Sequence, residues 1–207
     1  MKRKKTYSPQ HNTVQEMIIR VQEYQPAKGA FNYAERGYAV TEAHRLYNES
    51  FQLSKIYPRD SNLSEACRQA HRLWVTAFNN AFKPGFWDAF ERLSRGDAAG
   101  IEVAVAFLEA DPWFYRTGYV KTKLIRYIKS PMLTHTDKER LANVVLSVVD
   151  KRDDRDFRAY CRLACKVDSP ELRDQLAHLL KAENRNIQRR ARWVLEALGS
   201  HISKAAP

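Results

Sequence analysis

Between residues 97 and 199 the chain contains six helix-length segments that follow one another as three pairs. Apolar residues recur in each segment at the three- and four-residue spacing of an amphipathic α-helix, and we find no convincing β-strand pattern. Helix-boundary signals separate the segments, because Asp111, Ser130 and Ser169 each precede a proline. The pattern predicts an all-α fold with helical hairpins formed by residues 97–110 with 112–129, 136–150 with 154–167, and 169–182 with 185–199.

The three predicted hairpins begin near residues 97, 137 and 170, a spacing typical of stacked helix pairs in a solenoid. The last hairpin, SPELRDQLAHLLKAENRNIQRRARWVLEAL, resembles a HEAT repeat, in which an arginine often stands beside a small residue and an aliphatic run, as in residues 186–191. The resemblance covers roughly residues 97–198. It implies a right-handed α-α superhelix whose second helices line the concave side.

The N-terminal part of the chain shows no repeat that aligns with these hairpins. Residues 1–12 are polar and basic, and we predict a mobile tail there. Periodic apolar residues predict four helices within residues 13–96, which we interpret as a helical cap on the repeats. Residues 200–207 are predicted to be a C-terminal tail.

Positive charge is concentrated on the second helix of every predicted hairpin. The chain carries 35 lysines and arginines against 24 aspartates and glutamates, a formal net charge of +11. The first helices carry net charges of −3, −1 and 0, whereas the second helices, with residues 151–167 counted for the middle one, carry +5, +3 and +3. In each second helix the cations form a row. Phosphate recognition needs several cations at helical pitch facing one way, with an aromatic side chain available for stacking.

We therefore predict a non-catalytic protein that binds the phosphate backbone of DNA or RNA through a basic concave surface. The same charges allow a protein–protein interaction scaffold that grips an acidic partner. A solvated helix face would also be rich in lysine and arginine, because both residues favour helices. The predicted binding residues are Arg116, Tyr119, Lys123, Arg126, Lys151, Arg155, Arg158, Arg162, Lys166, Arg185, Arg189 and Arg192.

A third hypothesis is an enzyme that releases alkylated bases. The chain is similar in size, basic charge and helical composition to the alkylpurine DNA glycosylases built from HEAT-like repeats, which use aromatic residues and an aspartate in a cationic cleft. The residues that carry this similarity are Trp87 with Asp88, Asp111 with Trp113, and Trp193. Packing of these tryptophans in the core is the simpler expectation, with Asp111 as the cap of a helix that begins at Pro112 and buries Trp113.

The remaining reactive residues lead us to expect no cofactor. Cys67 with His71 and Cys161 with Cys165 are each four residues apart, so a zinc site would need their two helices to meet. Because cysteine is commonly a small core residue, we expect no metal site. The three cysteines form no disulfide framework, which predicts a reducing, cytoplasmic compartment, with association with the nucleoid as one option. No apolar run reaches the length of a membrane span, so we expect no membrane partner.

Overall fold

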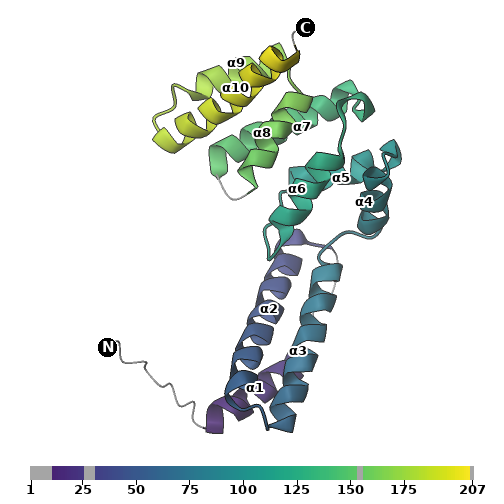
Figure 1. Cartoon of the computed structure of the whole chain (residues 1–207), viewed down its shortest axis with the longest axis vertical. Helices are drawn as coiled ribbons and strands as arrows, with labels where there is room; N and C mark the ends of the chain where they lie inside the picture. Colours follow the sequence, from purple (N-terminus) through teal and green to yellow (C-terminus); the bar gives the residue numbers. More distant parts are fainter. Residues whose placement is uncertain (1–10, 26–30, 153–155, 206–207) are drawn as a thin grey trace. The chain divides into compact units, whose positions relative to one another are not determined.

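The computed structural model of the chain describes residues 11–25, 31–152 and 156–205, and these residues form an all-α fold without β-strands (Figure 1). Contacts divide the chain into two compact units, residues 1–83 and residues 84–207. The short helix at residues 86–94 belongs to the second unit, because it packs against the helices that follow it. The sequence pattern had grouped this helix with the N-terminal region.

Unit 1 is built from helices α1 (His11–Glu23), α2 (Tyr33–Ile56) and α3 (Ser61–Asn80). Helices α2 and α3 lie side by side along their length, and α1 packs against both (Figure 1). Asn32 and Asp60 cap α2 and α3, since their side chains accept hydrogen bonds from backbone N–H groups of the first turn. Val21, Leu46 and Leu63 are among the buried side chains that hold the three helices together.

Unit 2 contains the remaining elements. They are α4 (Phe86–Ser94), η1 (Ala98–Gly100), α5 (Ile101–Ala110), α6 (Thr117–Tyr127), η2 (Ser130–Met132), α7 (His135–Lys151), α8 (Phe157–Lys166), α9 (Pro170–Leu179) and α10 (Arg185–Ala205). The boundary at α9 is the expected one, since Ser169 caps the helix with Pro170 in its first turn. Helix α7 begins at His135, one residue before the expected start at Thr136, because Thr134 and Asp137 form a reciprocal capping box there.

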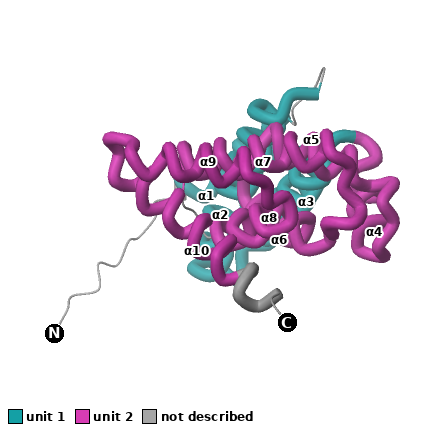
Figure 2. The backbone as a smooth tube through the Cα atoms, turned by 90° about the horizontal axis from the view of Figure 1, so that it is seen from above, with its two compact units in different colours: residues 1–83 teal, residues 84–207 magenta. Residues whose placement is uncertain are grey.

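From α5 onward the helices of unit 2 are arranged in two layers. Helices α5, α7 and α9 follow one another in one layer, which we name the first-helix layer, and α6, α8 and α10 follow one another in the second-helix layer (Figure 2). Helix α8 packs against α6 and α10 in its own layer and against α7 in the other. The core between the layers includes Leu141, Val145, Tyr160 and Leu163, which are fully buried. Burying one such side chain contributes about 1.5–3 kcal/mol.

The connection between α5 and α6 differs from the expected helix boundary. Asp111 is not the N-cap of a helix that begins at Pro112; it ends α5 in the left-handed conformation with φ 41°, and α6 begins only at Thr117 after Arg116, with φ 68°. The α-helical region of backbone conformation is disfavoured for a residue that precedes proline, so the chain turns at Asp111 and continues as a loop. Trp113 is therefore 75% exposed instead of buried, and Phe114 takes the core position.

Candidate nucleic-acid interface

The second-helix layer carries most of the predicted cations on exposed positions. Its helices have net charges of +3, +3 and +4, whereas those of the first-helix layer have −2, 0 and −1. Seven of the predicted cations on these helices are solvent-exposed, as is Tyr119. These are Lys123 and Arg126 on α6, Arg158 and Arg162 on α8, and Arg185, Arg189 and Arg192 on α10.

The arginines of the first-helix layer are ion-paired, unlike most exposed cations of the second-helix layer. On the first-helix layer, Arg140 of α7 lies 2.6 Å from carboxylate oxygens of both Glu102 and Glu109, and Arg173 of α9 lies 2.6 Å from Asp168. On the second-helix layer, six exposed cations form no ion pair with any residue that the structure describes. These are Lys123, Arg126, Arg158, Arg162, Arg185 and Arg192. Their charge is therefore available to an external anion.

The row predicted from Lys151 to Lys166 is not one continuous helix face. Lys151 is the last residue of α7, Arg152 has an extended backbone, and α8 begins at Phe157. Arg155 lies outside the described residues. Only Arg158 and Arg162 of the predicted row are exposed on α8, so this helix contributes a shorter basic face than the sequence predicts.

Lys166 occupies a structural position. Its ammonium group donates hydrogen bonds to the carbonyl oxygen of Ile125, at 2.5 Å, and to that of Ile128, at the C-terminal end of α6. A cation suits this site, since the last carbonyls of a helix have no partner within it. Burial lowers the pKa of Lys166. The structure therefore gives Lys166 a role in joining α6 to α8.

Aromatic rings accompany several exposed arginines. The guanidinium of Arg189 lies 5.1 Å from the ring centroid of Trp193. The Trp193 ring also packs edge-on against Phe157, with 5.8 Å between the ring centroids. Arg116 lies 5.4 Å from the ring of Tyr115. Both distances fall within the range of a cation–π interaction. The contacts place the rings of Trp193 and Tyr115 at the surface beside an arginine. The expectation that the tryptophans pack in the core is wrong for Trp113, and Trp87 and Trp193 are also 39% and 42% exposed.

Behind this surface lies a cluster of charges that the sequence analysis did not find. Lys121, whose side chain is only 1% exposed, donates to Asp111 at 2.5 Å. Arg152 also donates to Asp111, at 2.7 Å, and to Asp156 at 2.8 Å, and it lies 3.5 Å from the hydroxyl of Tyr160. The cluster joins the end of α5, helix α6, the end of α7 and the start of α8. The charges of its two carboxylates and two cations sum to zero.

The surroundings set the protonation of the cluster. Burial by itself would raise the pKa of Asp111, but hydrogen bonds from Arg152 and Lys121 outweigh it and hold that pKa below its usual range. Burial lowers the pKa of Lys121, and Asp111 partly offsets this effect. Burial also raises the pKa of Tyr160, so its hydroxyl stays protonated. Asp111 is thus ionised and held by two donors at neutral pH.

The remaining candidate groups are the cysteines and Asp88. No group of three or more histidine, cysteine or acidic side chains is placed to hold a metal ion in the described part of the chain. Burial raises the pKa of Cys161 to about 11, which leaves its thiol protonated at neutral pH. Asp88 is exposed in the first turn of α4. In the described ranges no helix is both long and apolar enough to cross a bilayer.

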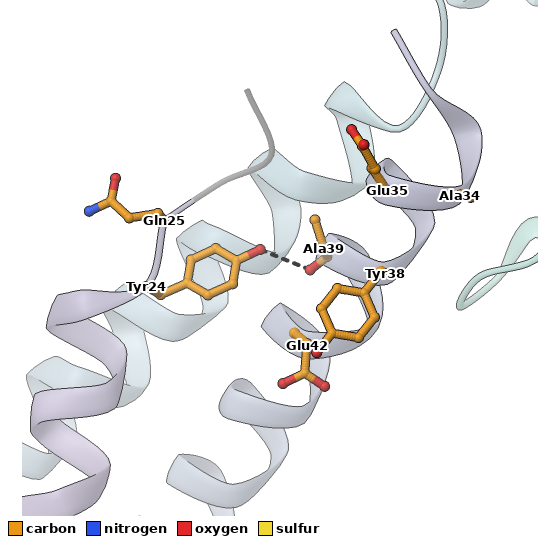
Figure 3. Close-up of a pocket in the computed structure, with 7 residues that line it drawn as sticks. All are labelled: Tyr24, Gln25, Ala34, Glu35, Tyr38, Ala39 and Glu42. Carbon is orange, nitrogen blue, oxygen red and sulfur yellow. Dashed lines mark hydrogen bonds between the residues drawn. The ribbon is translucent and has the colours of Figure 1, made fainter. Parts of the chain in front are cut away.

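Unit 1 has a hollow of its own, of about 680 Å³, between the end of α1 and the start of α2 (Figure 3). Tyr24, Tyr38, Glu35 and Glu42 are among its lining residues, and the Tyr24 hydroxyl donates to the carbonyl of Ala39 at 2.9 Å. A hydrogen bond from Arg45 lowers the pKa of Glu42, which is therefore ionised. The two carboxylates make this hollow a poor site for phosphate.

Comparison of the chain with protein-family models, with curated proteins and with solved structures gives no significant match.

Proposed function

We propose that unit 2 is a HEAT-like helical repeat that binds nucleic acid through the second-helix layer. Two layers of successive helices support a HEAT-like arrangement, with residues 97–199 as the repeats and the N-terminal helices as a cap. The phosphate backbone of DNA or RNA is the partner, contacted by the exposed cations of α6, α8 and α10. This assigns the protein to a non-catalytic role in the cytoplasm, close to nucleic acid.

One observation carries this proposal: six exposed cations on the second-helix layer have no carboxylate partner among the described residues, while the arginines of α7 and α9 are ion-paired. A merely solvated helix surface would distribute acidic and basic residues over both layers. Helix α8 instead has no acidic residue at all, and its exposed face includes Arg158 and Arg162. Counterion release from phosphates gives such a surface its affinity.

The test is a salt titration of duplex DNA binding by the full chain. If about five phosphates are neutralised, the logarithm of the binding constant should fall against the logarithm of salt concentration with a slope of roughly −4 to −5. Fluorescence anisotropy of a labelled duplex between low and physiological salt measures this slope. Absence of binding to any nucleic acid at low salt would overturn the proposal in favour of an acidic protein partner.

A second candidate is a glycosylase-type enzyme acting on alkylated bases. The observation that favours it is the contact of Asp111 with Arg152, two residues from the exposed Trp113. An ionised carboxylate could stabilise the positive charge that develops when an alkylated base departs. Incubation with alkylated DNA and measurement of released base, for the wild type and Asp111→Asn at a temperature where both are folded, tests this role. Release that persists in Asp111→Asn would exclude Asp111 as the catalytic residue.

A further inference from the structure

The exposed aromatic side chains of unit 2 gather at one edge. In the described part of this unit, the exposed large apolar side chains are all aromatic. Trp113, Tyr115 and Tyr119 flank the start of α6, and Trp193 lies within α10. Trp113 and Tyr119 are the most exposed, at 75% and 63%. No large aliphatic side chain accompanies them on the described surface of unit 2. We name the four residues Trp113, Tyr115, Tyr119 and Trp193 the aromatic edge.

Contacts within unit 2 bring these rings to the same region. Asp156, at the start of α8, lies beside Gly118, the neighbour of Tyr119. Asp156 is also linked through Arg152 to Asp111, which precedes the loop that carries Trp113 and Tyr115. Phe157, the next residue of α8, packs against Trp193 of α10. The starts of α6, α8 and α10 lie along one side of unit 2 in Figure 1.

The charge at this edge is positive. Asp111 and Asp156 are held by Lys121 and Arg152, so the buried cluster adds no net charge to the surface. The exposed cations on the elements of this edge include Arg116, Arg158, Arg185 and Arg189, against two exposed carboxylates, Glu183 in the described loop before α10 and Glu196 on α10. Arg116 lies over the ring of Tyr115 and Arg189 over that of Trp193, so rings and cations occur together here. This favours a ligand with both planar groups and negative charges.

We propose that the aromatic edge binds the unpaired bases of a single-stranded nucleic acid, which stack on Trp113 and Tyr119 while neighbouring arginines contact the phosphates. This inference rests on the proposed function and narrows its ligand. Bases in a duplex cover their faces by stacking on one another, whereas a single strand leaves them open to an aromatic ring. A stacked base strengthens binding by about tenfold or more.

The experiment compares three fluorescein-labelled probes of equal length on the full chain at one low salt concentration. The probes are a single-stranded DNA 12-mer, its duplex, and a single strand of the same length made of abasic sites, which keeps the phosphates and removes the bases. We expect the single strand to bind at least tenfold more tightly than either of the others. In Trp113→Leu with Tyr119→Leu, its affinity should fall to that of the abasic strand, because leucine is apolar without a stacking face.

Matched variants separate stacking from loss of folding. Trp113→Phe with Tyr119→Phe keeps both rings and should keep the preference for the single strand. Tyr38→Leu removes a tyrosine of similar exposure, 69%, from unit 1 and should change none of the three affinities. Circular dichroism of each variant confirms that the helices are intact.

The outcomes distinguish this inference from the proposed function. Equal affinities for all three probes, weakened together by Arg158→Glu with Arg162→Glu, would overturn the stacking site and retain phosphate binding. An equal loss of duplex and single-strand binding in the leucine variant would also overturn it, because the effect of the rings would then not depend on unpaired bases. Failure to bind any of the probes at low salt would overturn both proposals.

Discussion

The two helix layers of unit 2 differ in how the charges of their arginines are compensated. Arginines on the first-helix layer bridge carboxylates, as Arg140 does between Glu102 and Glu109. Exposed arginines on the second-helix layer, such as Arg158 and Arg162, have no such partner among the described residues. Charges that are compensated within the fold can stabilise it, whereas uncompensated ones repel each other and are retained at a cost.

The comparison predicts two classes of charge substitution. Changing a compensated charge should alter the free energy of unfolding and leave binding of nucleic acid largely unchanged. Changing an uncompensated cation of the second-helix layer should do the reverse. The buried cluster and Lys166 belong to the first class even though they lie at or behind the second-helix layer.

The largest effect is expected for Asp111→Asn. This change leaves Lys121 and Arg152 facing a neutral amide, and breaking a largely buried ion pair costs about 3 kcal/mol in the free energy of unfolding. The pKa of Asp111 is lowered in the folded chain, so its stabilisation is complete above the unfolded value of about 3.9 and is lost as the pH falls through the lower folded value. Urea unfolding at several pH values measures the difference from wild type.

That difference should be constant around neutral pH and shrink below about pH 4, where wild-type Asp111 becomes protonated. Asp88→Asn, at an exposed aspartate of the same unit, is the matched control and should leave the unfolding free energy within about 0.5 kcal/mol of wild type. Equal stability of Asp111→Asn and wild type at pH 7 would mean that the cluster does not stabilise the junction of α5 to α8.

Reversing two uncompensated charges is the next largest change. Arg158→Glu with Arg162→Glu should weaken duplex DNA binding by about 100-fold at low salt, because two phosphate contacts become repulsions, and should reduce the salt slope by about 2. Lys138→Glu with Lys181→Glu changes the net charge equally but at α7 and just after α9, and should have a much smaller effect. Similar losses in both variants would indicate attraction by net charge alone, without a defined surface.

The sequence was sufficient for the helices and for the asymmetry of charge between them, because both follow from periodicity and composition. The sequence did not predict which individual cations point into the solvent and which are buried. Lys121, Lys166 and Arg190 add to the positive charge of the second helices, yet Lys121 and Arg190 are buried and Lys166 donates to backbone carbonyls. A signal for Lys121 existed, since it continues the spacing of the buried Thr117, Leu124 and Ile128.

The loop that follows Asp111 could not be predicted from the sequence pattern. Asp-Pro favours a helix start as well as a chain turn, and the turn is decided by left-handed backbone conformations at Asp111 and Arg116 that depend on tertiary contacts. Phe114 lies in the core, and its backbone N–H donates a hydrogen bond to the Thr117 hydroxyl at 3.1 Å. The exposed position of Trp113 follows from this loop and has no periodic signal of its own.

Lys166→Met should have a smaller effect on stability than Asp111→Asn. Methionine keeps the apolar stem but removes the donor to the last carbonyls of α6, at a cost of about 1–2 kcal/mol. Arg162→Met, on the same helix, removes an exposed cation and should leave the unfolding free energy within about 0.5 kcal/mol of wild type while weakening DNA binding. Thermal unfolding and anisotropy on both variants test the pair, and the reverse assignment of effects would show that Lys166 contacts the ligand.

The smallest expected effect concerns the one exposed carboxylate in the described loop before α10. Glu183→Gln removes a negative charge near Arg185 and should tighten DNA binding by about twofold at low salt, with the gain lost at physiological salt because the charge is exposed and screened. Asp174→Asn removes an exposed carboxylate from α9 on the other layer and should give no gain. If both variants bind equally more tightly, the ligand senses the total charge of unit 2; a gain confined to Glu183→Gln would place the phosphates beside the start of α10.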